Sequence, residues 1–245
     1  MNHATIYILI IVFLATLVRS TVGFGESLVA VPLLLLFIPV ETAVPLSVMV
    51  SVTIAAVVVV QDHRHIHFQS AKWLIVFAVL GIPFGIYILI HGNEHIVKAG
   101  LGFLIILHSI YALTWKRSFR LAKDKIAWLF ICGFFSGVLG GAYGLNGPPL
   151  AVYGNIRGWT AKHFRATLQA YFLPASIFGM AGYWYQGLWT IDVTHYFFMS
   201  VPVIIPAIFL GRFFNHRLKD ETFLKSIYFG LIITGLLLLF QSFIK

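Results

Sequence analysis

The chain has 245 residues, of which 60% are hydrophobic and only 10% are charged, and its formal net charge is +9. A soluble domain typically has about 25% charged residues and about 45–50% apolar ones. This composition excludes an ordinary water-soluble fold and favours an integral membrane protein, built from helices or a closed barrel. Because the apolar runs are long and do not alternate with polar residues, we predict an all-α polytopic membrane protein.

The apolar residues fall into segments that are separated by short polar or glycine-rich stretches. Six segments stand alone and are long enough to cross about 30 Å of hydrocarbon. These six are 42–60, 72–90, 95–115, 163–186, 192–212 and 222–243. Four others form two pairs, 4–22 with 26–39 and 126–142 with 148–155, and a glycine-rich break joins the members of each pair.

The segment 148–155, PPLAVYGN, is too short to cross a membrane. At about 1.5 Å per residue it would reach only about 12 Å as a helix, less than half of the hydrocarbon thickness. We therefore predict that 126–155 is a re-entrant hairpin, or a helix broken near the middle of the membrane. By analogy, 4–39 is the same device with a longer second arm.

Basic residues gather in the loops at 61–72, 116–125, 155–165 and 212–225, which hold 14 of the 17 lysines and arginines. Basic loops of membrane proteins stay on the cytoplasmic side. If these four loops are cytoplasmic and each hairpin returns to its own side, both termini lie on the outer side. The positive net charge is then explained by the orientation of the protein in the lipid bilayer. We therefore expect no nucleic-acid partner.

This threading divides the chain into two halves of opposite orientation. Residues 1–118 hold the first hairpin and three spans, and residues 119–245 hold the second hairpin and three spans. Short matches in the same order, such as GFGES at 23–27 with GLNGP at 144–148, favour a repeat. We predict two inverted repeats, a pattern that in transporters places the central site at interrupted helices in matching positions.

Glycines precede the second arm of each hairpin: Gly23 and Gly25 in the first, Gly144 and Gly147 in the second. Glycine permits the tight turn of a helix break, and Pro148 suits the first turn of the helix that follows. A helix that begins inside a membrane presents unpaired N–H groups and the positive end of its dipole. We expect two such helix starts to form a small anion cage. The alternative is that these glycines only allow close helix packing.

Polar residues near the breaks are further candidates for this site. Ser27 and Asn146 can add hydrogen-bond donors. Arg19 and Glu26 each cost at least about 2.5 kcal/mol near the bilayer centre, so they should face the interior or water. One interpretation is that the two residues form a structural ion pair. The other is that the arginine attracts the anion while the neighbouring glutamate takes up and releases a proton. Gln169 is a candidate for the same path, although a hydrogen bond between helices explains it as well.

Histidines and one further arginine suggest other roles. His63, His65 and His67 alternate in HRHIH, which places them on one face only if the stretch is a strand. They lie in a short loop with one acidic neighbour, so we expect no metal site. We expect His108 to be a hydrogen-bonded packing residue and Arg165 to be an orientation charge. The sequence has no G-x-x-x-x-G-K-[ST] motif, and we expect no cofactor.

Three stretches of the chain carry a resemblance to a known family. RSTVGFGESLVAVPLLLL, GVLGGAYGLNGPPLAVYG and FRATLQAYFLPAS together resemble the TauE/SafE family of membrane anion transporters, often called sulfite exporters. The resemblance covers nearly the whole chain. In the family the first motif is commonly a run of glycines, and here Glu26 and Ser27 replace two of them. An acidic residue at the cage weighs against a plain dianion unless that residue is protonated or paired.

The resemblance implies that an integral protein of the bacterial inner membrane transports sulfite, an organosulfonate or another small organic anion. We therefore expect a secondary transporter with alternating access, with both termini periplasmic and with proton coupling through Glu26 as a hypothesis. Expected partners are the small anion, protons and lipid, and a homodimer is a further candidate assembly. An anion channel of the same architecture is the main alternative.

Two other classes fit the sequence less well. An intramembrane enzyme would need a nucleophile–base pair or a metal cluster at membrane depth, and the sequence offers neither. We therefore predict no catalytic residues. A chaperone or assembly factor is a further alternative.

Overall fold

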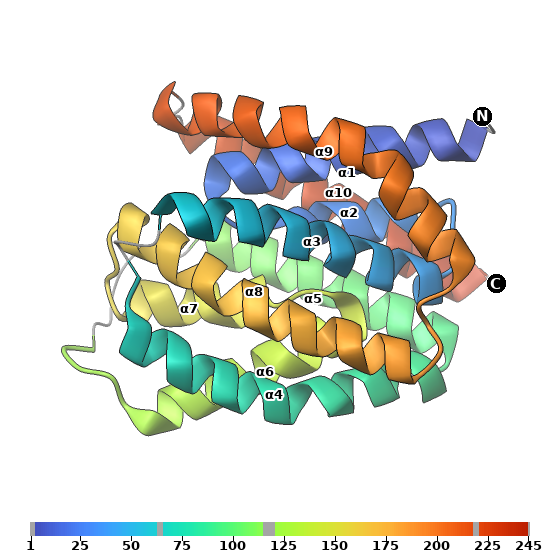
Figure 1. Cartoon of the computed structure of the whole chain (residues 1–245). Helices are drawn as coiled ribbons and strands as arrows, with labels where there is room; N and C mark the ends of the chain where they lie inside the picture. Colours follow the sequence, from blue (N-terminus) through green and yellow to red (C-terminus); the bar gives the residue numbers. More distant parts are fainter. Residues whose placement is uncertain (1–2, 63–65, 115–120, 218–220, 245) are drawn as a thin grey trace.

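The structure, a computed structural model, describes residues 3–62, 66–114, 121–217 and 221–244, and these residues form ten helices and no strand. Figure 1 shows the helices running nearly parallel or antiparallel in one bundle. They are α1 (His3–Val22), α2 (Glu26–Leu34), α3 (Val40–Asp62), α4 (Phe68–His91), α5 (Glu94–Thr114), α6 (Ile126–Tyr143), α7 (Gly147–Ile156), α8 (Ala161–Tyr185), α9 (Ile191–Arg217) and α10 (Glu221–Ile244). The prediction of an all-α protein is confirmed.

Within the described residues, six helices are long and apolar enough to cross a membrane, namely α1, α3, α4, α5, α6 and α9. Large apolar side chains remain more than half exposed on the outside of the bundle, among them Phe84 on α4 and Phe103 on α5. Lipid would cover such side chains, whereas a soluble protein rarely exposes so large an apolar surface. The chain is therefore a multi-pass membrane protein.

Both predicted helix breaks are present. The first separates Val22 of α1 from Glu26 of α2, and the second separates Tyr143 of α6 from Gly147 of α7. Figure 1 shows that the chain reverses direction at each break. With 9 and 10 residues, α2 and α7 each cover only about half of the hydrocarbon thickness.

The second arm of the first hairpin is shorter than predicted. α2 ends at Leu34, and residues 35–38 leave the helix in turns before Pro39. Proline disfavours the helical conformation in the residue that precedes it, which explains why the apolar run does not continue as a helix. The second arms of the two hairpins are therefore nearly equal in length.

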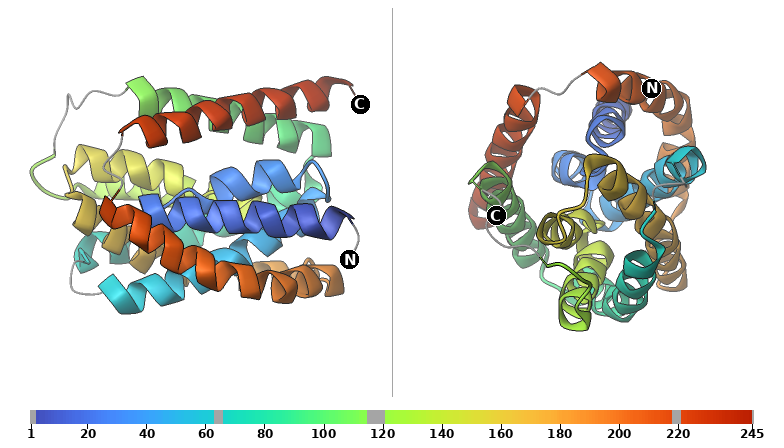
Figure 2. Two further views of the ribbon diagram at one scale, coloured as in Figure 1. Left: turned by 90° about the horizontal axis from the view of Figure 1, so that it is seen from above. Right: turned by 90° about the vertical axis from the view of Figure 1, so that its left-hand side faces the viewer.

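The long helices pack mainly in pairs: α1 with α9, α3 with α8, α4 with α6, and α5 with α10. The two views of Figure 2 show α2 and α7 toward the middle of the bundle, with longer helices around them. This arrangement places both helix breaks in the interior.

The pairing of α4 with α6 depends on glycines. A Cβ added at Gly137 of α6 would collide with the backbone of Ala78, and one at Gly81 of α4 would collide with the backbone of Phe134. Small residues let helix backbones approach closely inside membranes, where packing drives association. The first arm of the second hairpin is thus held against α4.

The described parts of the four basic loops lie at one end of the bundle, which we call the basic end, and His3 and Ile244 lie at the other (Figure 1). At the basic end, Asp124 joins three segments. Its Oδ1 accepts hydrogen bonds from Tyr153 Oη at 2.7 Å and Arg157 Nε at 2.6 Å, and its Oδ2 accepts one from Ser70 Oγ at 2.8 Å. These bonds tie α7 to the start of α4.

The Asp124 carboxylate is stabilised by this cluster. Partial burial raises its pKa, but the hydrogen bonds from Tyr153 and Ser70 and the charge of Arg157 outweigh burial, so the pKa lies below its ordinary value of 3.8. A carboxylate with a lowered pKa stabilises the folded state above its ordinary pKa, and this stabilisation is lost as the pH falls through the folded-state pKa.

We expect Asp124→Asn to lower the midpoint temperature of unfolding in detergent at pH 7. The difference from the parent should begin to shrink below about pH 4 and disappear as the pH falls through the lowered pKa of Asp124, where both proteins carry a neutral group. Asp192→Asn, at an exposed position at the start of α9, is the matched control and should change little. An equal, pH-independent effect of both variants would contradict the role of the cluster.

Candidate functional site

The two helix breaks meet around one small cavity in the interior of the bundle. Seven predicted site residues line it, namely Arg19, Gly25, Glu26, Ser27, Gly144, Asn146 and Gly147. The breaks also touch each other, since a Cβ at Gly144 would lie 3.6 Å from Ser27 Oγ. The cavity volume is about 20 Å³, which is enough for about one water molecule.

Glycine is required at three positions of the breaks. Gly23, Gly25 and Gly144 have φ angles of 99°, 92° and 68°, in the left-handed region that residues with a Cβ rarely adopt. Gly147 does not have the predicted turn role, because it is the first residue of α7 and its φ is not positive. It matters instead for close packing, since a Cβ there would lie 3.2 Å from the ring of Phe24.

The two helix starts offer different numbers of backbone donors. In α2 the N–H of Val29 bonds to the carbonyl oxygen of Gly25, so the N–H groups of 26–28 have no earlier carbonyl within the helix. In α7 the residues at 148–149 are prolines and have no N–H. Pro148 lies in the first turn, as predicted, but α7 contributes mainly the N–H of Gly147. The amide donors of the predicted cage therefore come chiefly from α2.

Among the described residues, Arg19 is the one basic side chain that lines the cavity, and it is 3% exposed. Its Nη1 lies 3.5 Å from Oε2 of Glu26 and donates a hydrogen bond to Ser51 Oγ. Its Nη2 donates to Gln169 Oε1 at 2.8 Å, and its guanidinium carbon lies 4.9 Å from the centre of the Phe172 ring. A buried charge persists only with such partners.

Glu26 is equally buried and fully engaged. Its Oε1 accepts a hydrogen bond from Ser47 Oγ at 2.8 Å, and its Oε2 accepts one from Ser27 Oγ at 3.0 Å. The Ser27 hydroxyl thus donates to Glu26 in this structure, and its role as a donor to an anion stays a prediction. Ser47 and Ser51 were not predicted; their spacing of one helical turn within an apolar span was the available signal.

Gln169 does not line the cavity but supports it from α8. Its Nε2 donates to the carbonyl oxygen of Gly23 at 2.6 Å, while its Oε1 accepts from Arg19. The hydrogen bond between helices is therefore present and also positions the arginine, whereas a place of Gln169 in the transport path stays a prediction. Arg165 lies closer to the site than an orientation charge requires, because a Cβ at Gly23 would be 3.1 Å from its Cγ.

Asn146 has unused hydrogen-bonding capacity at the cavity wall. Within the described residues its Oδ1 is buried and has no hydrogen-bond partner. Its backbone oxygen accepts a bond from Ser136 Oγ at 2.6 Å, and that hydroxyl also lies 2.9 Å from Tyr171 Oη. A carboxamide can turn to present either its oxygen or its NH₂ group, so Asn146 can donate to an anion.

The histidines do not form a metal site among the described residues. His67 stacks its ring on Trp159, and the other two histidines of its motif, His63 and His65, lie outside the described residues. His108 is buried against Phe24 and Tyr228. The expected hydrogen bond is absent at its Nε2, which has no partner in the described part of the chain.

Interrupted membrane-spanning helices that face each other in the interior are typical of membrane transporters. A family model described as Sulfite exporter TauE/SafE matches residues 8–238. The chain therefore belongs to this family of sulfite and anion exporters, as its motifs indicated. Comparisons with curated proteins and with solved structures find no match.

The geometry predicts strong coupling between Arg19 and Glu26. Arg19→Met should destabilise the protein by about 3–5 kcal/mol, because it leaves a buried carboxylate without its cation. The loss of stability in the double variant Arg19→Met, Glu26→Gln should be clearly smaller than the sum of the losses in the two single variants. The measurement is a double-mutant cycle of thermal unfolding in detergent.

The partly exposed pair Lys98 and Glu94, whose Nζ and Oε1 lie 2.6 Å apart on α5, provides the matched control. The corresponding cycle of Lys98→Met with Glu94→Gln should give at most about 1 kcal/mol of coupling. Additive effects at Arg19 and Glu26 would contradict the ion pair.

Proposed function

We propose that the chain is a secondary transporter that moves a small anion across a bacterial inner membrane by alternating access. The observation that carries the proposal is the cavity where both helix breaks meet around the buried Arg19. A guanidinium and the free N–H groups of 26–28 are the donors that an oxyanion requires. Sulfite, an organosulfonate or a small carboxylate are the candidate substrates, and family membership supports an anion of this kind.

The charge of the cavity suggests how a proton takes part. With Arg19 and Glu26 both ionised, the pair is neutral and attracts an anion weakly. A proton on Glu26 leaves the charge of Arg19 unopposed, so proton and anion bind together. Loss of the proton restores the ion pair and favours release of the anion.

The small cavity supports a carrier that changes conformation. A volume of about 20 Å³ has no room for an oxyanion of four heavy atoms, so the breaks must separate to admit one. Helix pairing supports two inverted repeats that could move against each other. If each helix of the first half (α1 to α5) is replaced by its counterpart in the second half (α6 to α10), the packed pair of α1 and α9 becomes the pair of α6 and α4. The pair of α3 and α8 and the pair of α5 and α10 are unchanged by this exchange.

The orientation proposed from the loop charges places the basic end in the cytoplasm. The described part of that end carries Lys72, Lys123, Lys125, Arg157 and Arg212, whereas the other end carries Lys98. The positive-inside rule then puts both termini in the periplasm.

Anion flux in proteoliposomes tests the proposed function, with sulfite, an alkanesulfonate and a carboxylate as substrates. We expect saturable flux of at least one of them, accelerated by unlabelled substrate on the trans side. Flux that does not saturate and shows no exchange would identify a channel instead. Arg19→Gln should lower flux at least tenfold, while Lys98→Gln, at the partly exposed pair, should not.

Glu26→Gln tests the proton. The amide keeps the shape of the carboxyl group but cannot release a proton, so flux should persist and lose its response to a pH gradient. The same proteoliposomes, assayed with and without a gradient, provide the measurement. An unchanged pH response in Glu26→Gln would exclude Glu26 as the coupling group.

A further inference from the structure

An aromatic residue lies in the first helix break, and another lies directly before the second. Phe24 directly precedes Gly25 in the first break, and Tyr143 directly precedes Gly144 in the second, and both glycines have positive φ. The two rings are buried, with exposed fractions of 8% and 7%. Neither belongs to the polar network around Arg19, so their role is open.

Phe24 fills the space between the cavity and the basic end. Its ring centre lies 5.8 Å from that of Phe164 and 6.3 Å from that of His108, both in edge-to-face contact. It also contacts the second break, since a Cβ at Gly147 would lie 3.2 Å from its Cδ2. Phe164 lies in the first turn of α8, which starts at the basic end, so the ring faces that end.

Tyr143 occupies the other side of the cavity. A Cβ at Gly100 of α5 would lie 2.8 Å from its Oη, so the ring reaches the second turn of that helix. α5 starts at the end opposite the basic end. Gly100 and His108 are eight residues apart, which corresponds to about 12 Å along the helix axis. The two aromatic residues therefore contact the same helix on either side of the cavity.

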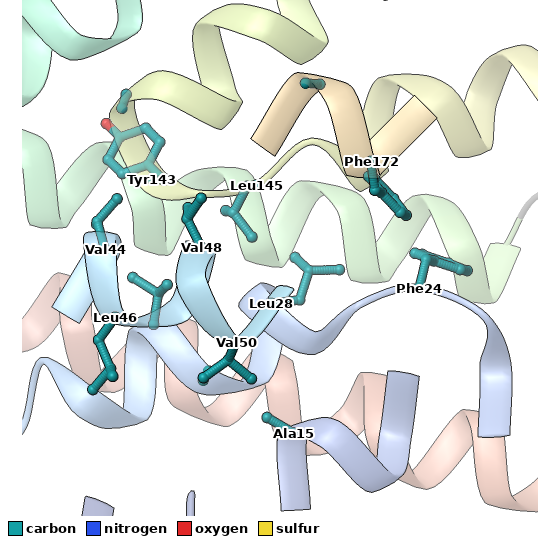
Figure 3. Packing of buried hydrophobic residues seen from close by; sticks show 14 of the residues in the cluster. Ala15, Phe24, Leu28, Val44, Leu46, Val48, Val50, Tyr143, Leu145 and Phe172 are labelled. Atoms are coloured by element: carbon teal, nitrogen blue, oxygen red, sulfur yellow. The ribbon is translucent and has the colours of Figure 1, made fainter. Parts of the chain in front are cut away.

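Figure 3 shows this arrangement directly. Phe24 and Tyr143 lie on opposite sides of Leu28 and Leu145, and these two leucines line the cavity. Neither ring lines the cavity itself, and the two rings lie beyond its wall on opposite sides.

Glycines give each ring freedom to move. Phe24 stands between Gly23 and Gly25, and Tyr143 is followed by Gly144. Glycine adopts positive and negative φ with similar ease, so rotation at these residues displaces the aromatic ring at little conformational cost. Hinges of this kind absorb the backbone changes of opening and closing movements.

We propose that Phe24 and Tyr143 are the two gates of the cavity, Phe24 toward the basic end and Tyr143 toward the opposite end. Each ring closes one side while the other side opens. The inference rests on the proposed transport function. In it, the packing contacts of the two aromatic rings keep the cavity closed on one side at a time.

Side-specific thiol labelling tests the gates in inner-membrane vesicles of known orientation. The parent for the test is Leu145→Cys in a Cys132→Ala background, because Leu145 lines the cavity outside the polar network. The probe is a charged, membrane-impermeant methanethiosulfonate, applied from either side. A separate variant, Lys123→Cys, identifies the side on which the basic end lies.

We expect Phe24→Ala to raise the labelling rate at least tenfold from the side of the basic end and not from the other side. Tyr143→Ala should have the opposite sidedness. Phe84→Ala, which removes a ring that is 60% exposed on α4, should change neither rate. Equal labelling of parent and gate variants, or an increase from the same side in both, would overturn the proposal.

Smaller substitutions keep the test decisive if an alanine variant does not fold. Phe24→Leu and Tyr143→Leu should give intermediate increases with the same sidedness, and their failure to do so would overturn the proposal. Tyr143→Phe retains the ring and should label like the parent. Measurements of anion flux distinguish the gate proposal from the proposed transport function. If the parent transports an anion and the variants label like the parent, only the gate proposal is rejected. If the variants label in the expected side-specific way but the parent transports no anion, only the transport function is rejected.

Discussion

The buried ion pair of Arg19 and Glu26 is the constraint on which the interior of this protein depends. Each charge would be costly in a membrane interior without partners, and the surrounding helices supply them. Ser47 and Ser51 of α3 bond to the glutamate and the arginine respectively, and Gln169 of α8 bonds to the arginine and to the first break. One pair of charges thus fixes the relative position of α1, α2, α3 and α8.

The fold was largely predictable because its determinants are local. Apolar runs of sufficient length set the long helices, and glycines marked both breaks, with a following proline in the second. The end of α2 was less predictable: the run 28–39 is apolar throughout, and only Pro39 indicates that the helix stops before it. The exposed helix faces follow from the same composition, since lipid replaces water as the solvent of the outer surface.

The site was predictable only in part, because its contacts join residues distant in the sequence. Arg19, Glu26 and Gln169 were recognisable as polar residues in apolar segments. Ser47 and Ser51 gave only the weaker signal of their spacing, because a hydroxyl in a membrane helix can bond to its own backbone and then indicates no partner. Phe24 was equally hidden, since an aromatic residue in an apolar chain acquires meaning only from its place between two glycines.

The two prolines at the start of α7 have a consequence for the unliganded protein. A helix that begins in a dry interior with ordinary residues would leave several donors unsatisfied whenever no anion is bound. At 148–149 those donors do not exist, so the second hairpin tip tolerates desolvation by itself. The first hairpin tip keeps its amides, so under the proposed function the release of an anion would leave unsatisfied N–H donors chiefly in the first half of the chain.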